Sequence, residues 1–206
     1  LTGFVEQARE EARGWEERAK QLERTANFDP QLSELYSRRA FDAQLTEAAR
    51  RCRAKNTPLA LMFIDVDRFK DINDTHGHQA GDGVLRVLAA IVSAHAVQCG
   101  GYPARYGGEE LVMLCEGLDE KRAVDRAEAL RLDVSRCPFM NTAHAGQAGA
   151  GPEILRMTVS IGVAQLQPGQ GASDLVLAAD RAMYAAKGRG RNTVAGVSSL
   201  AGEPPG

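Results

Sequence analysis

The chain has 206 residues, 44% of them hydrophobic and 25% charged, which is enough apolar side chain to bury one globular core. The net charge of −2 shows no basic excess, so no nucleic-acid partner is expected. Four cysteines without CxxC spacing or histidine partners disfavour a zinc site or a disulfide framework, and favour reduced thiols in a cytoplasmic protein. No apolar run approaches the roughly 20 residues of a membrane span, so this segment is not expected to contact a membrane directly.

Residues 1–26 carry apolar side chains spaced alternately four and three positions apart, with charged and amide residues between them. This heptad spacing predicts a coiled-coil helix that pairs with a second helix, and hence a signalling stalk over residues 1–28. A lone amphipathic helix packed on its own domain is the alternative, because the repeat is short and several seam positions are alanine. Asp29-Pro30 then breaks the helix. Since the chain begins at Leu1 without methionine, we expect an upstream part to be missing.

Helical and strand patterns alternate from Ser37 onward, which indicates one α/β domain over residues 29–198. The predicted helices cover residues 37–54, 79–96, 118–136 and 174–187. The predicted strands cover residues 58–65, 102–106, 111–115, 157–164 and 193–197, and a Gly-Gly turn joins the second and third of them. Residues 141–152 are rich in small side chains and are predicted to form a mobile loop, and residues 199–206 a disordered tail.

Two acids end the first predicted strand, in the stretch FIDVDRFKDIND at residues 63–74. Asp65 and Asp67 would lie at the carboxyl end of a buried strand, a usual place for a ligand in α/β sheets. Two neighbouring carboxylates repel each other, and a hard divalent cation relieves that repulsion. The alternative is that these acids only solubilise a strand end. These residues alone do not separate the two interpretations.

The next stretch, HGHQAGDGVL at residues 76–85, places two histidines in a glycine-containing loop that opens a helix. The surrounding residue types are acids and amides, which suit a hard, oxygen-ligated ion better than zinc. A glycine loop at a helix start instead permits close approach of a ligand, and Asp82 can accept hydrogen bonds from it.

Two later stretches carry the remaining charges. RYGGEEL at residues 105–111 puts two glutamates beside a turn, where they either keep a hairpin tip soluble or present carboxylates to a cation. AAKGRGRN at residues 185–192 puts Lys187, Arg189 and Arg191 at a helix end, where they complement the helix dipole or bind phosphate. Carboxylate loops for magnesium and cations for a polyphosphate together indicate phosphoryl or nucleotidyl transfer.

Four ordered stretches resemble the GGDEF family of diguanylate cyclases. RYGGEEL resembles the GG(D/E)EF signature, and DVDRFKDINDTHGHQAGDGVL resembles the family's D-x-D-x-F-K-x-I-N-D-x-x-G-H-x-x-G-D-x-x-L. VSIGVA and ADRAMYAAKGRGRN resemble its closing strand and its A-D-x-A-x-Y-x-A-K-x-x-G-R-N segment. The resemblance spans most of residues 29–194. It implies an α/β (α+β) fold: a nucleotidyl-cyclase-like palm with a central, mainly antiparallel sheet flanked by helices.

The resemblance also implies a reaction, in which two GTP molecules condense to cyclic di-GMP and two pyrophosphates. Each domain would bind one GTP, and two domains of a homodimer would face each other about a two-fold axis. The expected cofactor is Mg²⁺ or Mn²⁺. An upstream sensory domain would control the reaction, and the protein would be cytoplasmic or the cytoplasmic part of a membrane-anchored protein.

The roles implied by the resemblance fall on eleven positions of this sequence. The metal would be held by Asp65, the Val66 carbonyl and Glu109. Glu109 and Glu110 would be the catalytic acids. The guanine would meet Asn73, Asp82 and the neighbouring His78. The phosphates would meet Lys187 and Arg191, with backbone amides near Phe69 and Lys70.

The sequence departs from the family pattern in three places. Leu111 replaces the phenylalanine of the signature, an exchange of buried apolar side chains that we expect activity to survive. The stretch DPQLSELYSRR, residues 29–39, is a degraded form of the family's D-x-L-T-G-L-x-N-R-R. The product-inhibition motif, Arg-x-x-Asp, would fall at Gln98 to Gly101, which cannot supply its charges. We therefore predict no such feedback site.

A second hypothesis is a catalytically inactive GGDEF domain that binds GTP or cyclic di-GMP and signals by protein interaction. The intact signature acids favour the enzyme, because inactive members usually lose them.

Overall fold

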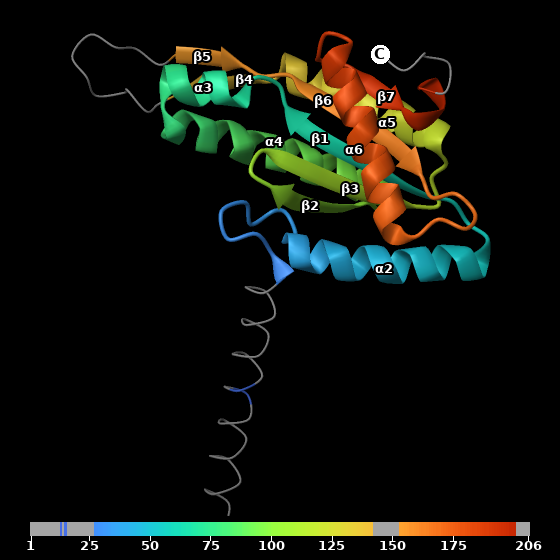
Figure 1. Ribbon diagram of the computed structural model, residues 1–206. Coiled ribbons are helices and arrows are strands. Elements are labelled where there is room, and N and C mark those ends of the chain that lie inside the picture. Colours follow the sequence, from blue (N-terminus) through green and yellow to red (C-terminus); the bar gives the residue numbers. More distant parts are fainter. Residues whose placement is uncertain (1–12, 14, 16–26, 142–152, 201–206) are drawn as a thin grey trace, which may run out of the picture.

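The computed structural model describes residues 13, 15, 27–141 and 153–200 (Figure 1). Most of the predicted stalk, of the predicted mobile loop and of the predicted tail lies outside the described residues. Ser199 was expected in the tail, but it belongs to the short 3-10 helix η1 (Val197–Ser199). Its hydroxyl donates to the carbonyl of Gly196 at 2.7 Å, so local hydrogen bonding extends past the predicted domain end.

The central sheet has five strands in the order β2-β3-β1-β6-β7. All neighbouring strands are antiparallel except β6 and β7, which run parallel, as expected for a mainly antiparallel palm. The strand β1 lies in the middle and is buried along its whole length. The strands are β1 (Leu59–Val66), β2 (Tyr102–Gly107), β3 (Glu110–Glu116), β6 (Val159–Gln165) and β7 (Val194–Gly196).

Helices pack on both faces of this sheet (Figure 1). The apolar residues of α4 (His78–Cys99) and α5 (Glu120–Arg136) share one core cluster, and those of α2 (Arg38–Lys55) and α6 (Ala172–Gly188) share the other. Side chains of β1 alternate between the two clusters, with Ile64 in the first and Phe63 in the second. The same alternation turns Asp65 toward the α2/α6 face. The α/β fold predicted from the sequence is confirmed.

By length and composition, α4 is the one described helix that could cross a membrane. Half of its most apolar stretch is buried inside the domain, as in the core helix of a globular protein. Its apolar residues, among them Leu85, Leu88 and Val92, pack in the α4/α5 core.

One helix and two strands were not predicted. Helix α3 (Phe69–His76) has eight residues, none of them fully buried, and its partly buried Phe69 and Ile72 make too short an apolar repeat to reveal a helix. Strands β4 (Pro138–Asn141) and β5 (Glu153–Arg156) pair in a separate two-stranded sheet, with Met140 opposite Ile154. Both strands are short and largely exposed, which leaves little hydrophobic pattern to read.

Gly162 determines how closely α6 approaches the sheet. A Cβ atom on Gly162 would lie 2.0 Å from the carbonyl oxygen of Ala179, a distance that no real contact reaches. The bare backbone of β6 therefore lets α6 pack directly against it. This close packing carries the C-terminal end of α6, including Lys187, to the end of β1.

The stretch that departs from the family pattern folds as a turn docked on β2. The carboxylate of Asp29 accepts the backbone N–H groups of Gln31 and Leu32, at 2.9 and 2.8 Å. The same carboxylate pairs with the guanidinium of Arg105 at 3.2 Å. Ser37 then caps α2 by accepting from the N–H of Ala40, as predicted. The altered sequence thus still gives an ordered connection into α2.

Candidate functional site

The signature stretch forms the hairpin between β2 and β3. Gly107 pairs with Glu110, so the turn itself is made by Gly108 and Glu109, one position later than the expected Gly-Gly turn. A register shift between Arg105 and Gly107 causes this displacement. Gly108 has a φ of 43°, which favours glycine. The guanidinium of Arg105 donates to the Gly108 carbonyl at 3.0 and 2.8 Å, so the turn that carries Glu109 is held in place.

Asp65 lies near the end of β1, opposite Glu110 on β3 and Ser160 on β6. Its Oδ1 atom is 2.7 Å from the ammonium nitrogen of Lys187. That oxygen is buried, and the ammonium of Lys187 is its charged partner among the described residues. Burial raises the pKa of Asp65, the charge of Lys187 lowers it, and the nearby Glu109 raises it again.

A cavity of about 370 Å³ opens beside Asp65. It joins the end of β1, the start of α3, the signature turn and the end of α6. Seven residues predicted from the sequence line it: Asp65, Val66, Phe69, Lys70, Glu109, Lys187 and Arg191. The structure therefore brings the expected metal ligands and the expected phosphate ligands to one place.

Arg68 and Asp71 also line this cavity, and the sequence did not single them out. Arg68 has a φ of 55°, a left-handed conformation at the start of α3. No side chain caps this helix at Arg68. The first N–H groups of α3, near Phe69 and Lys70, therefore face a site where an anion would be stabilised. The available sequence signal for both residues was their charge: Arg68 and Asp71 stand within the stretch DRFKD.

The cavity contains the donor set of a hard cation. The acids Asp65, Asp71 and Glu109 line it, and so does Val66, whose carbonyl the resemblance assigns to the metal. Within the described ranges, no group of three or more Asp, Glu, His or Cys side chains gathers as a closed metal site. Magnesium commonly takes only one or two carboxylates and completes its shell with water and substrate phosphates. The buried carboxylate of Asp65, with a single ammonium as its counter-charge, fits this arrangement.

The three residues expected at the guanine do not line this cavity. Asn73 lies on α3, and a Cβ atom at Gly81 on α4 would be only 2.0 Å from its amide oxygen. Asn73 therefore sits against the first turns of α4, beside Asp82. His78 begins α4 one turn earlier, and both His78 and Asp82 are exposed. These residues form a polar strip along the α3–α4 pair, next to the α3 wall of the cavity.

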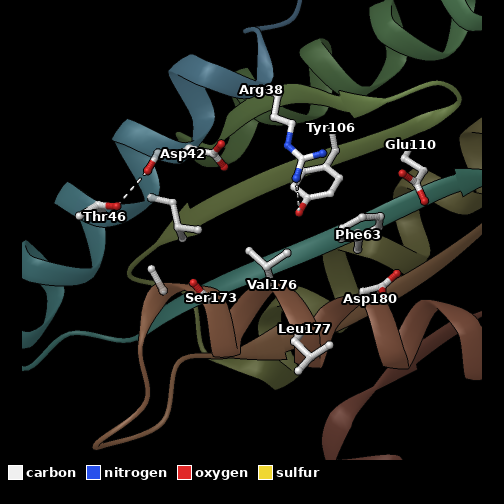
Figure 2. Close-up of a pocket in the computed structure, with 12 residues that line it drawn as sticks. Arg38, Asp42, Thr46, Phe63, Tyr106, Glu110, Ser173, Val176, Leu177 and Asp180 are labelled. Carbon is white, nitrogen blue, oxygen red and sulfur yellow. Dashed lines mark hydrogen bonds between the residues drawn. The ribbon is translucent and has the colours of Figure 1, made fainter.

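Glu110 faces a second hollow of about 570 Å³ between α2 and α6 (Figure 2). Arg38 on α2 stacks over Tyr106 at 4.0 Å, and Asp180 on α6 lies on the opposite wall. Burial raises the pKa of Glu110, and the charges of Asp65 and Asp180 raise it further. The two adjacent signature acids, Glu109 and Glu110, thus open onto different cavities.

The cations after α6 also separate. Arg191 lines the first cavity, whereas the guanidinium of Arg189 donates to the hydroxyl and the carbonyl of Ser199, at 3.3 and 3.2 Å. Lys187 and Arg191, the two cations expected at the phosphates, therefore both line the first cavity.

Comparison with known proteins identifies the family of this chain. Residues 26–193 match the family described as "Diguanylate cyclase, GGDEF domain". The chain is 40% identical over 167 residues to the response regulator PleD of Caulobacter vibrioides, covering 81% of this chain and 35% of PleD. It is 32% identical over 163 residues to the diguanylate cyclase DosC of Escherichia coli, covering 79% of this chain and 34% of DosC. The chain thus spans about a third of these relatives.

Solved structures give the same answer for the fold. The coiled coil and GGDEF domain of DgcB from Caulobacter crescentus, in complex with c-di-GMP, superposes with a TM-score of 0.85 at 30% identity. That match covers 95% of this chain and 98% of the DgcB chain. The active GGEEF domain of a diguanylate cyclase from Vibrio cholerae superposes with a TM-score of 0.67 at 29% identity, covering 75% and 92% of the two chains. Sequence, fold and site together show that this chain belongs to the GGDEF family of diguanylate cyclase domains.

Proposed function

We propose that this domain is an active diguanylate cyclase that condenses two GTP molecules into cyclic di-GMP and two pyrophosphates. One observation carries the proposal. The carboxylate of Asp65, whose buried Oδ1 has the Lys187 ammonium as its counter-charge, lies in a cavity that also holds Glu109 and Arg191. An inactive binding domain has no need to keep a second acid, Glu109, at the tip of a turn fixed by its own hydrogen bonds.

The phosphates of GTP would bind on the α6 and α3 side of the cavity. Lys187 and Arg191 carry the positive charge, and the uncapped first turn of α3 adds backbone N–H donors. Lys187 pairs with Asp65 in this structure. Its ammonium becomes available to a phosphate oxygen once Asp65 has another cationic partner.

Asp65, Glu109 and the Val66 carbonyl would hold Mg²⁺ or Mn²⁺. When bound, such an ion neutralises charge on the reacting phosphate and polarises it toward attack by a 3′-hydroxyl. Each condensation forms a bond from the 3′-oxygen to the α-phosphorus of the other nucleotide, and breaks the bond to pyrophosphate. Glu109 would accept the hydroxyl proton. Glu110, whose pKa is raised by burial and by its acidic neighbours, is a second acceptor close by.

The polar strip on α3 and α4 would read the guanine. The carboxylate of Asp82 can accept hydrogen bonds from the N1–H and N2–H groups that guanine presents and adenine lacks. Asn73, held against Gly81, can complete that contact, with His78 near the same nucleotide.

One domain supplies one nucleotide site, so the product requires two chains that face each other in a homodimer. The predicted stalk would bring the two chains together under control of an upstream sensory domain. The protein would be cytoplasmic or the cytoplasmic part of a membrane-anchored protein. Gln98 and Gly101 lie at the end of α4 and in the turn after it, and neither can supply the charges of a product-inhibition motif. We therefore expect turnover without feedback at that position.

Turnover is tested by incubating the protein with GTP and Mg²⁺ and following cyclic di-GMP by chromatography. The proposal predicts cyclic di-GMP and pyrophosphate in a ratio of one to two. GTP binding without any product, at high protein concentration, would favour the inactive signalling domain.

Replacing Glu109 with Gln should reduce turnover by about 100-fold or more, because the amide neither binds the cation as a charge nor accepts the proton. The fold should survive, since Glu109 sits in a turn that Arg105 holds through the Gly108 carbonyl. Glu116→Gln is the control: it makes the same change at the far end of β3, the strand that follows the turn, where Glu116 pairs with Arg51 away from the cavity. Retained turnover in Glu109→Gln would contradict the catalytic assignment.

A further inference from the structure

Asp67 follows the end of β1, two residues after Asp65, and its carboxylate does not line the nucleotide cavity. Its Oδ1 accepts the hydroxyl of Ser160 at 2.6 Å. Its Oδ2 accepts the hydroxyl of Thr158 at 2.7 Å and the backbone N–H of Asn192 at 2.9 Å. Only 7% of Asp67 is exposed. These three hydrogen bonds use most of the acceptor capacity of the buried carboxylate.

The third donor belongs to the loop that carries Arg191. This loop connects α6 to β7, and Arg191 and Asn192 have φ angles of 67° and 44°. Left-handed conformations are uncommon for non-glycine residues, although asparagine adopts them more readily than arginine, so the one at Arg191 indicates support from its surroundings. Asn192 is held twice, since its side-chain oxygen also accepts from the guanidinium of Arg131 on α5 at 2.7 Å. The residue after Arg191 is therefore fixed from both sides.

We propose that Asp67 is a positioning residue for the polyphosphate of GTP. By accepting a hydrogen bond from the backbone N–H of Asn192, Asp67 holds the loop in the conformation in which Arg191 lines the cavity. Arg191 itself is exposed, so without this hydrogen bond its side chain and backbone would sample many conformations before binding. Pre-ordering the loop removes that entropic cost and strengthens binding without any contact to the nucleotide.

Two other roles for Asp67 fit the geometry less well. A metal ligand needs free oxygen lone pairs facing the cation, but both oxygens of Asp67 are occupied and turned to β6 and the loop. An acid that merely keeps a strand end soluble would be exposed, whereas Asp67 is buried. The inference rests on the proposed binding of GTP at this cavity.

The test is a double-mutant cycle in nucleotide affinity. The probe is 3′-deoxy-GTP with Mg²⁺, because it lacks the attacking hydroxyl and cannot be condensed. Arg191→Ala and Asp67→Ala should each weaken its binding by about tenfold, the loss expected for a charge-assisted bond to phosphate. The double variant should bind no more weakly than the weaker single one, since a loop without Arg191 gains nothing from being positioned. Binding of GMP, which lacks the β- and γ-phosphates, should not change.

Asp67→Asn guards against a folding defect, because its amide can still accept from Asn192 while the charge is lost. Its binding of 3′-deoxy-GTP should fall less than that of Asp67→Ala, with a thermal melt close to that of the unmodified protein. Its affinity for Mn²⁺, followed by electron paramagnetic resonance, should stay unchanged. Asp125→Asn, an exposed acid on α5, is the control for net charge.

Three results would overturn the inference: additive losses in the double variant, equal weakening of GMP binding, or loss of Mn²⁺ binding in Asp67→Asn. Unchanged 3′-deoxy-GTP binding in Asp67→Ala would also contradict it while leaving the proposed function standing. Failure of the unmodified protein to bind 3′-deoxy-GTP would instead contradict the proposed function.

Discussion

Asp65 and Asp67 lie two residues apart at the end of one strand, yet their surroundings are opposite. Asp65 has a buried oxygen whose charged partner is the ammonium of Lys187, near a second acid. Asp67 has both oxygens occupied by neutral donors from β6 and the loop before β7. Buried polar groups are normally satisfied. The neutral donors of Asp67 hold structure together, whereas the partner of Asp65 is itself a cation, which a metal ion could replace.

Asp65→Asn is the variant with the largest expected effect on the contrast between the two acids. We expect turnover to fall by about 100- to 1,000-fold, because a fixed charge at the reacting phosphate is lost. The melting temperature of the nucleotide-free protein should rise, since burial raises the pKa of Asp65 and its charge is a net cost there. A fall in the melting temperature would mean that the Lys187 ion pair stabilises the fold more than burial costs.

Replacing Lys187 with Met has a smaller expected effect, because Arg191 and the start of α3 remain to bind phosphate. The KM for GTP should increase by about tenfold to 100-fold, as one charge-assisted contact is lost. Lys187→Arg keeps the charge at the same helix end and serves as the control. A KM unchanged by Lys187→Met would show that Lys187 pairs only with Asp65 and never with the substrate.

The pH dependence of kcat/KM should show the smallest change. Burial raises the pKa of Asp65 above the ordinary value of 3.8, so the active carboxylate is lost at a higher pH than usual as the solution is acidified. Lys187 lowers that pKa, so Lys187→Met should move the acid limb to still higher pH. An acid limb that stays in place would show that Asp65 does not control it.

The raised pKa of Asp65 also determines how the free energy of unfolding depends on pH. Because the folded protein binds a proton at Asp65 more tightly than the unfolded chain, the free energy of unfolding should decrease as pH rises from 3.8 through the folded pKa. Asp65→Asn should remove this slope.

Much of the fold was predictable because it is encoded in hydrophobic periodicity. The apolar run in β1 and the alternating face of β6 are direct consequences of their burial. Residue types in the glycine and acid stretches indicated a cation and a phosphate, and the resemblance to a family assigned positions to them. Seven of those positions do line one cavity.

The rest depends on contacts between distant segments. Nothing in the order of residues tells that Asp67 reaches Asn192, 125 positions away, while Asp65 does not. The turn lies at Gly108 and Glu109 because the register of β2 shifts between Arg105 and Gly107. The Gly-Gly pair in the sequence does not reveal this shift. Helix α3 was not predicted because it is short and none of its residues is fully buried, although it forms a wall of the site.

The most direct test of the account is the rate of cyclic di-GMP formation from GTP and Mg²⁺, measured over a wide range of protein concentration. If each chain holds one GTP at the end of β1 and two chains must meet, the rate per chain rises with concentration and then levels off. Product formation that stays proportional to protein at concentrations where the chain is monomeric would contradict the two-chain site. No product at any concentration, despite GTP binding, would contradict the assignment of Asp65 and Glu109 to catalysis.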